Sequence, residues 1–151
     1  MEEGAGASRP RAVLFVCALN SVRSPMAAAL LRQMAGEGTT VASAGVRKDT
    51  LDPFAAAAML EAGIDITEHE PMTIEELEDL EGLDFDLIVT LSPEAHHTAL
   101  ALTDRIAAAV EYWPTADPTA TEGNREQRLD AYRTVRDQLA ARIKARFFPG
   151  G

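Results

Sequence analysis

The chain has 151 residues, a hydrophobic share of 46% and a formal net charge of −10. That length suits one domain with one core, and no apolar run approaches the roughly 20 residues that span a membrane. A negative field of this kind repels nucleic acid and anionic membrane surfaces. A site for an anion must therefore be built locally, from backbone donors and one or two cationic side chains.

The beginning of the chain and its single cysteine bear on its organisation. Residues 1–10 carry Glu, Gly, Ala, Ser and Pro without the apolar stretch of an export signal, so we expect a flexible tail there and a domain over residues 11–148. One cysteine excludes a disulfide within the chain. These features together predict a protein of the reducing cytoplasm.

An apolar run over residues 12–17 is the first predicted element, and it is typical of a central strand buried on both faces. A loop follows, and then Ser24 and Pro25, which suit the N-cap and first turn of a helix. Residues 26–34 are rich in Ala and Leu and predict that helix. The domain therefore begins as strand, loop and helix.

Strands and helices alternate along the rest of the chain. The further expected strands lie at residues 40–44, 85–91 and 107–113, and the further helices begin at Asp52-Pro53, Thr73, Ser92-Pro93 and Arg125. Such alternation predicts an α/β fold, with a single domain and a four-stranded parallel sheet covered by helices on both faces. Folds of this class bind ligands beyond the carboxyl ends of their strands.

The loop after the first strand carries the strongest chemical signal. Cys17 and Arg23 are separated by five residues, between a buried strand and the start of a helix. A loop that curls here can aim its N–H groups at one point, and the helix N-terminus adds free donors. Arg23 can then hold two oxygens of a phosphoryl group with its planar fork. The expected phosphate-binding residues are Ala18, Leu19, Asn20, Ser21, Val22, Arg23 and Ser24.

The same positive field favours the thiolate form of Cys17, which makes this residue a candidate nucleophile. Ser24 could donate a hydrogen bond to that thiolate. The alternative interpretation makes Cys17 a core residue, Arg23 a surface residue and Ser24 a simple N-cap. Spacing and placement together favour catalysis. Asn20 is open between a left-handed position that shapes the loop and an ordinary turn.

These residues resemble the opening of the low-molecular-weight protein tyrosine phosphatase family, whose fold the thioredoxin-coupled arsenate reductases share. The resemblance is close over residues 13–27 and extends to the final helix. The other segments that carry it are Ser43-Ala44-Gly45, Gly63-Ile64 with His69, and Asp117-Pro118.

The resemblance implies phosphomonoester hydrolysis, of protein phosphotyrosine among other esters, through a phosphocysteine on Cys17. Asp117 would protonate the leaving oxygen and then activate water, without a metal or another cofactor. Ser43 would brace Asn20, and His69 would sit behind the loop near Ser24. On residue chemistry alone, Asp117 could instead be a turn residue. Ser43 could equally be a strand end, and His69 a packed histidine.

The chain departs from the family pattern around the expected site. Leu19 replaces the usual glycine, and Val22 replaces a common second cysteine. Thr119 and Ala120 stand where the phosphatases often carry tyrosines that enclose a substrate ring. A smaller or more polar phosphate ester is therefore a candidate substrate beside a phosphoprotein.

Two other functions compete with phosphatase activity. The segments Glu122-Gly123, Arg133 and Arg136-Asp137 resemble the closing part of the arsenate reductases. Ser92 stands where the first of their two further cysteines would be, so arsenate reduction would need an external low-molecular-weight thiol. The third possibility is a non-catalytic module that binds a phosphoryl group or anion, although Cys17 and Asp117 together argue against it.

Overall fold

The structure, a computed structural model, describes residues 9–150, so most of the expected tail over residues 1–10 lies outside the described residues. The strands are β2 (Ala12–Cys17), β3 (Thr40–Gly45), β4 (Leu87–Thr90) and β5 (Ala109–Tyr112). The helices are α1 (Arg23–Ala35), α2 (Pro53–Glu61), α3 (Ile74–Glu81), α4 (Pro93–Leu102) and α5 (Arg125–Phe147), with 3₁₀ turns η1 (Gly36–Gly38) and η2 (Pro118–Ala120).

The four strands form one parallel sheet in the order β3-β2-β4-β5, which confirms the expected fold class. The central strand β2 ends at Cys17, which pairs with Gly45 at the end of β3. Because all strands run the same way, their carboxyl ends meet at one edge of the sheet. The loop after Cys17 therefore starts at the edge where such folds bind ligands.

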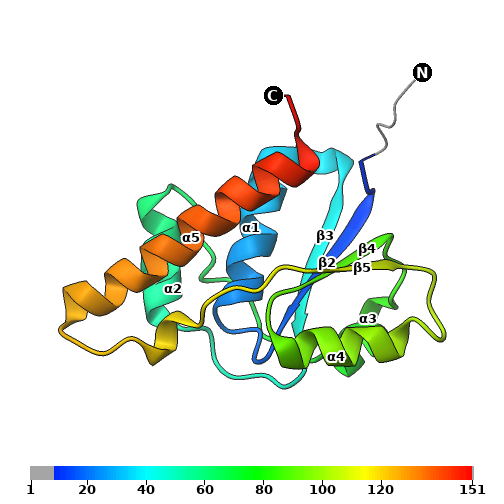
Figure 1. Ribbon diagram of the computed structural model, residues 1–151, viewed down its shortest axis with the longest axis horizontal. Helices are drawn as coiled ribbons and strands as arrows, with labels where there is room; N and C mark the ends of the chain where they lie inside the picture. The colour runs from blue at the N-terminus through cyan, green and yellow to red at the C-terminus, as the bar shows by residue number, and fades with distance from the viewer. Residues whose placement is uncertain (1–8, 151) are drawn as a thin grey trace.

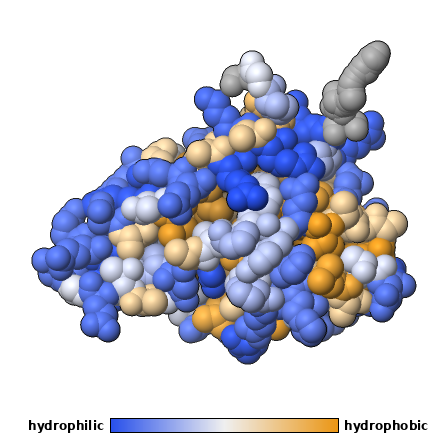
Figure 2. Space-filling view, in the orientation of Figure 1, coloured by the Kyte–Doolittle hydropathy of each residue, from blue (hydrophilic) through white to orange (hydrophobic). Residues whose placement is uncertain are grey.

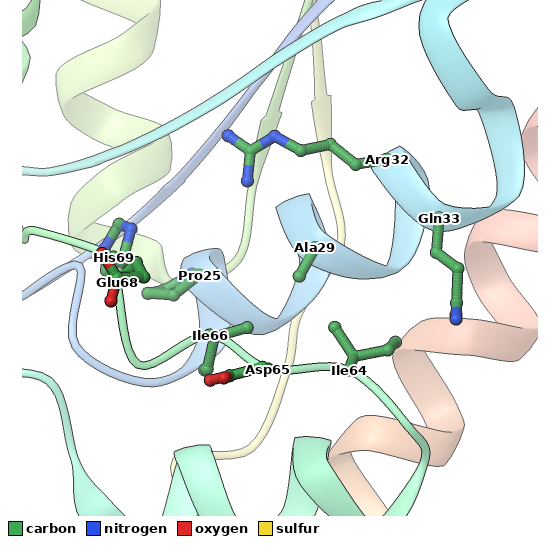
Figure 3. Close-up of a pocket in the computed structure, with 9 residues that line it drawn as sticks. All are labelled: Pro25, Ala29, Arg32, Gln33, Ile64, Asp65, Ile66, Glu68 and His69. Atoms are coloured by element: carbon green, nitrogen blue, oxygen red, sulfur yellow. The ribbon is translucent and has the colours of Figure 1, made fainter.

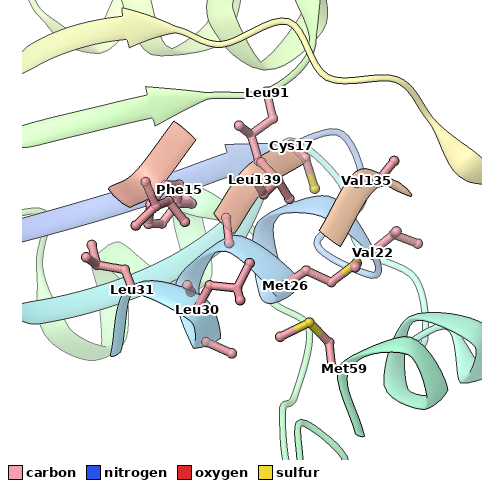
Figure 4. Packing of buried hydrophobic residues seen from close by; sticks show 14 of the residues in the cluster. Phe15, Cys17, Val22, Met26, Leu30, Leu31, Met59, Leu91, Val135 and Leu139 are labelled. Carbon is pink, nitrogen blue, oxygen red and sulfur yellow. The ribbon is translucent and has the colours of Figure 1, made fainter. Parts of the chain in front are cut away.

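Two layers of helices cover the sheet, with α1, α2 and α5 on one face and α3 and α4 on the other (Figure 1). The side chains of β2 alternate between the two resulting cores. Val13, Phe15 and Cys17 pack with α1 and α5, as Figure 4 shows for the last two, whereas Leu14 and Val16 pack toward α3 and α4. A two-residue period on a strand buried on both faces explains the unbroken apolar run.

The terminal helix α5 presents an apolar stripe to the core that it shares with α1 and α2. Its buried side chains are Leu129, Tyr132, Val135, Leu139, Ile143 and Phe147. The opposite face is charged, and most of the surface seen in Figure 2 is hydrophilic with small, separate apolar patches. In the part of the chain that the structure describes, no helix combines the length and the apolar character needed to cross a membrane.

Several predicted boundaries need correction. Helix α1 begins at Arg23, with Val22 at the N-cap and no side-chain cap, so the prediction that Ser24 caps this helix is wrong. The hydroxyl of Ser24 is turned toward Cys17 and Asn20 instead. Strand β4 is shorter than the apolar run over residues 85–91, because that run reflects burial and only Leu87–Thr90 pair with a neighbour.

Three predicted helix starts are confirmed by their caps. Asp52 accepts a hydrogen bond from the amide of Phe54 at the start of α2. Thr73 and Glu76 form a capping box at α3, and Ser92 accepts from the amide of Ala95 at α4. A side-chain oxygen at each of these positions satisfies an amide that has no partner within its helix.

Candidate active site

A cavity of 170 Å³ lies beside residues 17–24, which we call the Cys17 loop. It brings together side chains that are far apart in the sequence. Its lining consists of Cys17, Ala18, Leu19, Ser21, Val22, Arg23, Arg47, Asp117 and Thr119. One small cavity is therefore lined by the candidate nucleophile, the candidate phosphate-binding arginine and the candidate acid.

The carbonyl groups of the Cys17 loop are held away from the cavity by the segment over residues 46–52. Amides of that segment donate to four carbonyl groups of the loop. The pairs are Val46 to Cys17 (3.1 Å), Arg47 to Ala18 (2.8 Å), Asp49 to Leu19 (3.1 Å) and Asp52 to Ser21 (3.1 Å). Because the carbonyls face outward, the amides of the loop are left to point inward, as in an anion-binding nest.

The inward amides have almost no other partner. Between Ala18 and Ser24, and within residues 9–150, only the amide of Asn20 donates a hydrogen bond, and its acceptor is the sulfur of Cys17 at 3.3 Å. The first amides of α1 add to this set, because the first turn of a helix leaves its N–H groups without intrahelical acceptors. A tetrahedral oxyanion beside Cys17 would meet these donors.

Cys17 is 2% exposed, and its sulfur lies 2.9 Å from the hydroxyl oxygen of Ser24. That hydroxyl accepts a hydrogen bond from the Nδ2 group of Asn20 at 2.8 Å. Its own hydrogen can go to the sulfur or to the carbonyl of Ala44, which is farther away at 3.5 Å. The contact with the sulfur is the shorter one, so Ser24 can donate to Cys17 whenever the sulfur is a thiolate.

Asn20 connects the Cys17 loop to three neighbouring parts of the fold. Its backbone is left-handed, with a φ of 53°, and its side chain is fully buried. The Nδ2 group donates to Ser24 and, at 3.0 Å, to the hydroxyl of Ser43 on β3. The Oδ1 atom accepts from the amide of Met72 at 2.9 Å and lies 3.1 Å from Nε2 of His69. Asn20 thus holds the loop in shape from behind, and Ser43 lies where a brace for Asn20 was expected.

His69 contacts Asn20, whose side chain in turn donates a hydrogen bond to Ser24. Its Nε2 atom lies near both the carbonyl oxygen and Oδ1 of Asn20, at 3.3 and 3.1 Å. Both neighbours are acceptors, so Nε2 carries a hydrogen and donates. Burial lowers the pKa of His69, the bond to Asn20 offsets part of this, and the charge of Arg32 lowers the pKa further. The imidazole is therefore a neutral brace near pH 7.

The position of His69 separates it from the cavity that Cys17 lines. It borders a different pocket of 560 Å³ between α1 and the segment over residues 64–69, together with Pro25 and Arg32 (Figure 3). Substrate bound at Cys17 would not touch His69 in this arrangement. Any influence of His69 on Cys17 must pass through Asn20.

Gly45 makes the close approach of β3 to the Cys17 loop possible. A Cβ atom at this position would lie 2.1 Å from the carbonyl oxygen of Arg47 and 2.9 Å from the amide nitrogen of Asn20. Both contacts are with backbone atoms, so they cannot be relieved by a side-chain rotation. The last residue of β3 must therefore lack a side chain for the loop and the segment over residues 46–52 to pack together.

Arg23 and Asp117 approach the cavity from different elements. Arg23 opens α1, and its Nη1 donates to the carbonyl of Thr115 at 3.0 Å, which ties the loop to the segment after β5. Asp117 is exposed and caps η2, where its Oδ1 accepts from the amide (3.0 Å) and hydroxyl (2.7 Å) of Thr119. Its Oδ2 atom makes no hydrogen bond within the described residues, so it is available at the cavity mouth.

A hydrogen-bonded pair behind this segment, Tyr132 and Asp52, was not anticipated. The hydroxyl of Tyr132 on α5 donates to Oδ2 of Asp52 at 2.6 Å. Burial, the bond to Asp52 and the negative charges of Asp52 and Asp117 together raise the pKa of Tyr132 well above its ordinary value. A tyrosine at an apolar position of a helix gives no sign in the sequence of such a partner.

Arg47 lines the cavity but was not among the predicted site residues. Its position just after β3, at the edge of the sheet where ligands bind, was the only feature of the sequence that pointed to the site.

The residues that suggested an arsenate reductase, by contrast, lie outside the cavity. Arg133 binds Glu61 and Glu126, and Arg136 binds Asp137 and the carbonyl of Ala58, so both join α5 to α2 or to neighbours on α5.

Comparisons with known proteins agree with this arrangement. Residues 12–147 match the family described as low molecular weight phosphotyrosine protein phosphatase. The chain is 34% identical to an arsenate reductase of Bacillus licheniformis over 135 residues, which is 89% of this chain and 93% of that protein.

Two solved structures are similar in fold. The tyrosine phosphatase AmsI of Erwinia amylovora superposes with a TM-score of 0.73 at 19% identity, over 93% of each chain. The YwlE arginine phosphatase of Geobacillus stearothermophilus superposes with a TM-score of 0.67 at 26% identity, over 89% of each chain. The same scaffold therefore accompanies three different activities.

Proposed function

Because this chain belongs to the low molecular weight phosphotyrosine protein phosphatase family, we propose that it hydrolyses phosphate monoesters through a phosphocysteine on Cys17. One observation carries the proposal. The sulfur of Cys17 accepts a hydrogen bond from the amide of Asn20 and lies 2.9 Å from the hydroxyl oxygen of Ser24, in a cavity that Arg23 and Asp117 also line. A binding module for anions requires neither an activated sulfur nor an acid.

In the first step, the thiolate of Cys17 attacks phosphorus and the bond from phosphorus to the ester oxygen breaks. The amides of the Cys17 loop and the guanidinium of Arg23 bind the three remaining oxygens and stabilise the charge on them. The leaving oxygen takes a proton from Asp117 and departs as an alcohol.

In the second step, Asp117 removes a proton from water, and the resulting hydroxide attacks phosphorus. The bond from phosphorus to sulfur breaks, and the electron pair returns to Cys17. Ser24 then donates its hydrogen bond to the thiolate as the leaving group, which lowers the free energy of this step. Inorganic phosphate leaves, and Asp117 is protonated for the next cycle.

Arsenate reduction is the second candidate, and the 34% identity to a protein named arsenate reductase favours it. Arsenate would condense with Cys17 and release water. One small thiol would attack the sulfur of that adduct, forming a mixed disulfide and releasing arsenite, and a second thiol would restore Cys17. The two thiols supply the two electrons that arsenic gains.

We take residues 11–148 as the catalytic domain, which agrees with the matched range of 12–147. A free thiolate at Cys17 is preserved best in a reducing compartment, which favours the cytoplasm.

A single panel of substrates tests the proposal. Wild type and Cys17→Ser are compared on para-nitrophenyl phosphate, a phosphotyrosine peptide, a phosphoarginine peptide, and arsenate with glutathione. We expect hydrolysis of at least one phosphate compound by wild type and a loss of more than about a thousandfold in Cys17→Ser. Equal rates in both proteins would refute the thiol mechanism. Reduction of arsenate beside negligible hydrolysis would establish the second candidate in its place.

A further inference from the structure

A second arginine, Arg47, lines the cavity beside Cys17, and the proposed reaction does not use it. Arg47 lines it together with Cys17, Arg23 and Asp117. The protein as a whole carries a net charge of −10, so two arginines in a cavity of 170 Å³ form a local exception. Arg23 is sufficient to bind the oxygens of one phosphoryl group, which leaves Arg47 free to act on another part of the substrate.

The backbone of Arg47 is held firmly beside the Cys17 loop. Its amide donates to the carbonyl of Ala18 at 2.8 Å, and the amide of Asp49 donates to Leu19 at 3.1 Å. Its carbonyl oxygen folds back over Gly45, where a Cβ atom would stand only 2.1 Å away. The side chain of Arg47 therefore starts from a defined point next to the residues that would bind phosphate.

The side chain itself is held only by an exposed ion pair. Its Nη1 binds Oε2 of Glu94 in the first turn of α4, and the two side chains are 57% and 44% exposed. No other hydrogen bond of this guanidinium is formed within residues 9–150. Exposed ion pairs contribute little free energy, so an anion on a bound substrate can replace or share Glu94.

The lining of the cavity also lacks an aromatic clamp. Leu19 and Thr119 line it together with Arg47, and no residue of the lining is aromatic. A substrate group that passes this wall would meet a cation and a hydroxyl. The chemistry of the entrance therefore suits a charged group better than an uncharged ring.

We propose that Arg47 forms a second anion subsite, and that the substrate is a phosphate monoester carrying another negatively charged group near the phosphate. This inference rests on the proposed phosphatase function and specifies its substrate. The second anion could be a carboxylate of a small phosphorylated acid, or an acidic residue beside the phosphorylated side chain of a peptide. Both sources present the same group to Arg47.

A matched pair of small substrates tests the subsite. The probes are 3- and 4-carboxyphenyl phosphate and the corresponding carboxamides, which differ in charge and little in shape. In wild type we expect kcat/KM to favour an acid over its amide by roughly threefold to tenfold, mainly through KM. In Arg47→Gln this preference should disappear, and in Glu94→Gln it should increase because Arg47 is released.

Lys48 offers a matched control. It is the next residue, is 49% exposed and pairs with Glu76 on α3 at 2.7 Å, but it does not line the cavity. Lys48→Gln should leave the preference for the acid as in wild type. If Lys48→Gln and Arg47→Gln reduce the preference equally, the effect comes from overall charge and the subsite is refuted.

Peptides distinguish the two sources of the second anion. Phosphotyrosine peptides with Glu beside the phosphorylated residue are compared with the same peptides carrying Gln. A preference for Glu that depends on Arg47 supports a protein substrate, whereas a preference confined to the small acids supports a metabolite. No charge preference in either series would overturn the inference.

Binding to Cys17→Ser, measured by calorimetry, separates this inference from the proposed function. If wild type shows no turnover that depends on Cys17, the proposed function fails, and the ratio of acid to amide affinity still decides the subsite. If turnover depends on Cys17 but neither kcat/KM nor affinity responds to Arg47→Gln, only the subsite fails.

Discussion

The hydroxyl oxygen of Ser24 lies 2.9 Å from the sulfur of Cys17, although the residue sits inside the first turn of α1 and not at its cap. The hydroxyl is oriented by Asn20, whose Nδ2 group donates to it at 2.8 Å. A donor held in this way favours the thiolate of Cys17 at each stage at which the sulfur carries charge.

Replacement of this donor should therefore affect Cys17 directly. In Ser24→Ala we expect hydrolysis to slow by about tenfold to a hundredfold, because a charge-assisted hydrogen bond is lost. The rate of Cys17 alkylation by iodoacetamide at pH 6 should fall as well. Ser43→Ala is the control, since Ser43 reaches the sulfur only through Asn20. Alkylation of Ser24→Ala at the wild-type rate would contradict this assignment.

Gly45→Ala should damage both the site and the fold. Its Cβ would collide with the backbone of Arg47 and Asn20, so we expect a loss of about 3 kcal/mol in the free energy of unfolding and most of the activity. Urea denaturation and hydrolysis of para-nitrophenyl phosphate measure the two effects. Gly38→Ala is the matched control, since a Cβ there meets no atom within 4 Å. Similar behaviour of the two variants would refute the steric argument.

The stability of the protein should fall as the pH drops below the ordinary pKa of histidine, 6.5, because the pKa of His69 is lowered in the folded state. At pH values between the folded and the unfolded pKa of His69, the unfolded chain binds more protons than the folded protein. The free energy of unfolding therefore rises with pH over this range, and the contribution of His69 is fully present above pH 6.5. The slope can reach at most about 1.4 kcal/mol per pH unit for one group.

Urea unfolding at pH 7.5 and 5.5 measures this effect. His69→Gln, which keeps an N–H donor for Asn20, should remove the part of the pH dependence that His69 causes. Carboxylates with lowered pKa values contribute separately to the pH dependence of stability, because the stability that they provide is lost only as the pH falls below about 4.5. These are Glu61, Asp65, Glu76, Glu78 and Glu111. An unchanged pH dependence in His69→Gln would show that His69 does not titrate as proposed.

Asp117→Asn should reduce turnover according to the leaving group. A substrate such as phenyl phosphate, whose leaving oxygen needs a proton, should lose about a hundredfold in kcat/KM, and para-nitrophenyl phosphate should lose much less. Asn is close to Asp in shape and can keep an oxygen acceptor for Thr119. A uniform loss across leaving groups would assign the proton transfer to another residue.

Local patterns were sufficient for the elements whose residues carry their own signal. The apolar run at residues 12–17 and the stripe on α5 predicted a central strand and a covering helix, because burial on one or two faces dictates the spacing of apolar side chains. The caps at Asp52, Thr73 and Ser92 were predictable for the same reason, since the bonding partner lies within three residues.

Prediction was incomplete where a side chain has partners outside its own element. The N-cap role expected for Ser24 is wrong, whereas its expected contact with Cys17 is formed. The sequence leaves the role of Asn20 open, because the partners of its side-chain amide are distant in the chain. These partners are Ser43, Met72 and His69. Arg47 was missed as a lining residue because a charged side chain in a loop has no pattern that marks its direction.

By itself, therefore, the sequence determined that a cysteine and an arginine stand at the two ends of one short loop after a buried strand. Only five residues separate them before the helix begins, so the backbone of the loop has few possible conformations. Only the tertiary structure decided which groups complete that site. The cavity is completed by Asp117 and Arg47, and Asn20 is held by Ser43 and His69. These four residues come from separate parts of the chain, so their positions depend on how the strands pair and the helices pack. Spacing along a chain specifies neighbours within a few residues, whereas contacts between distant residues depend on the packing of the whole domain.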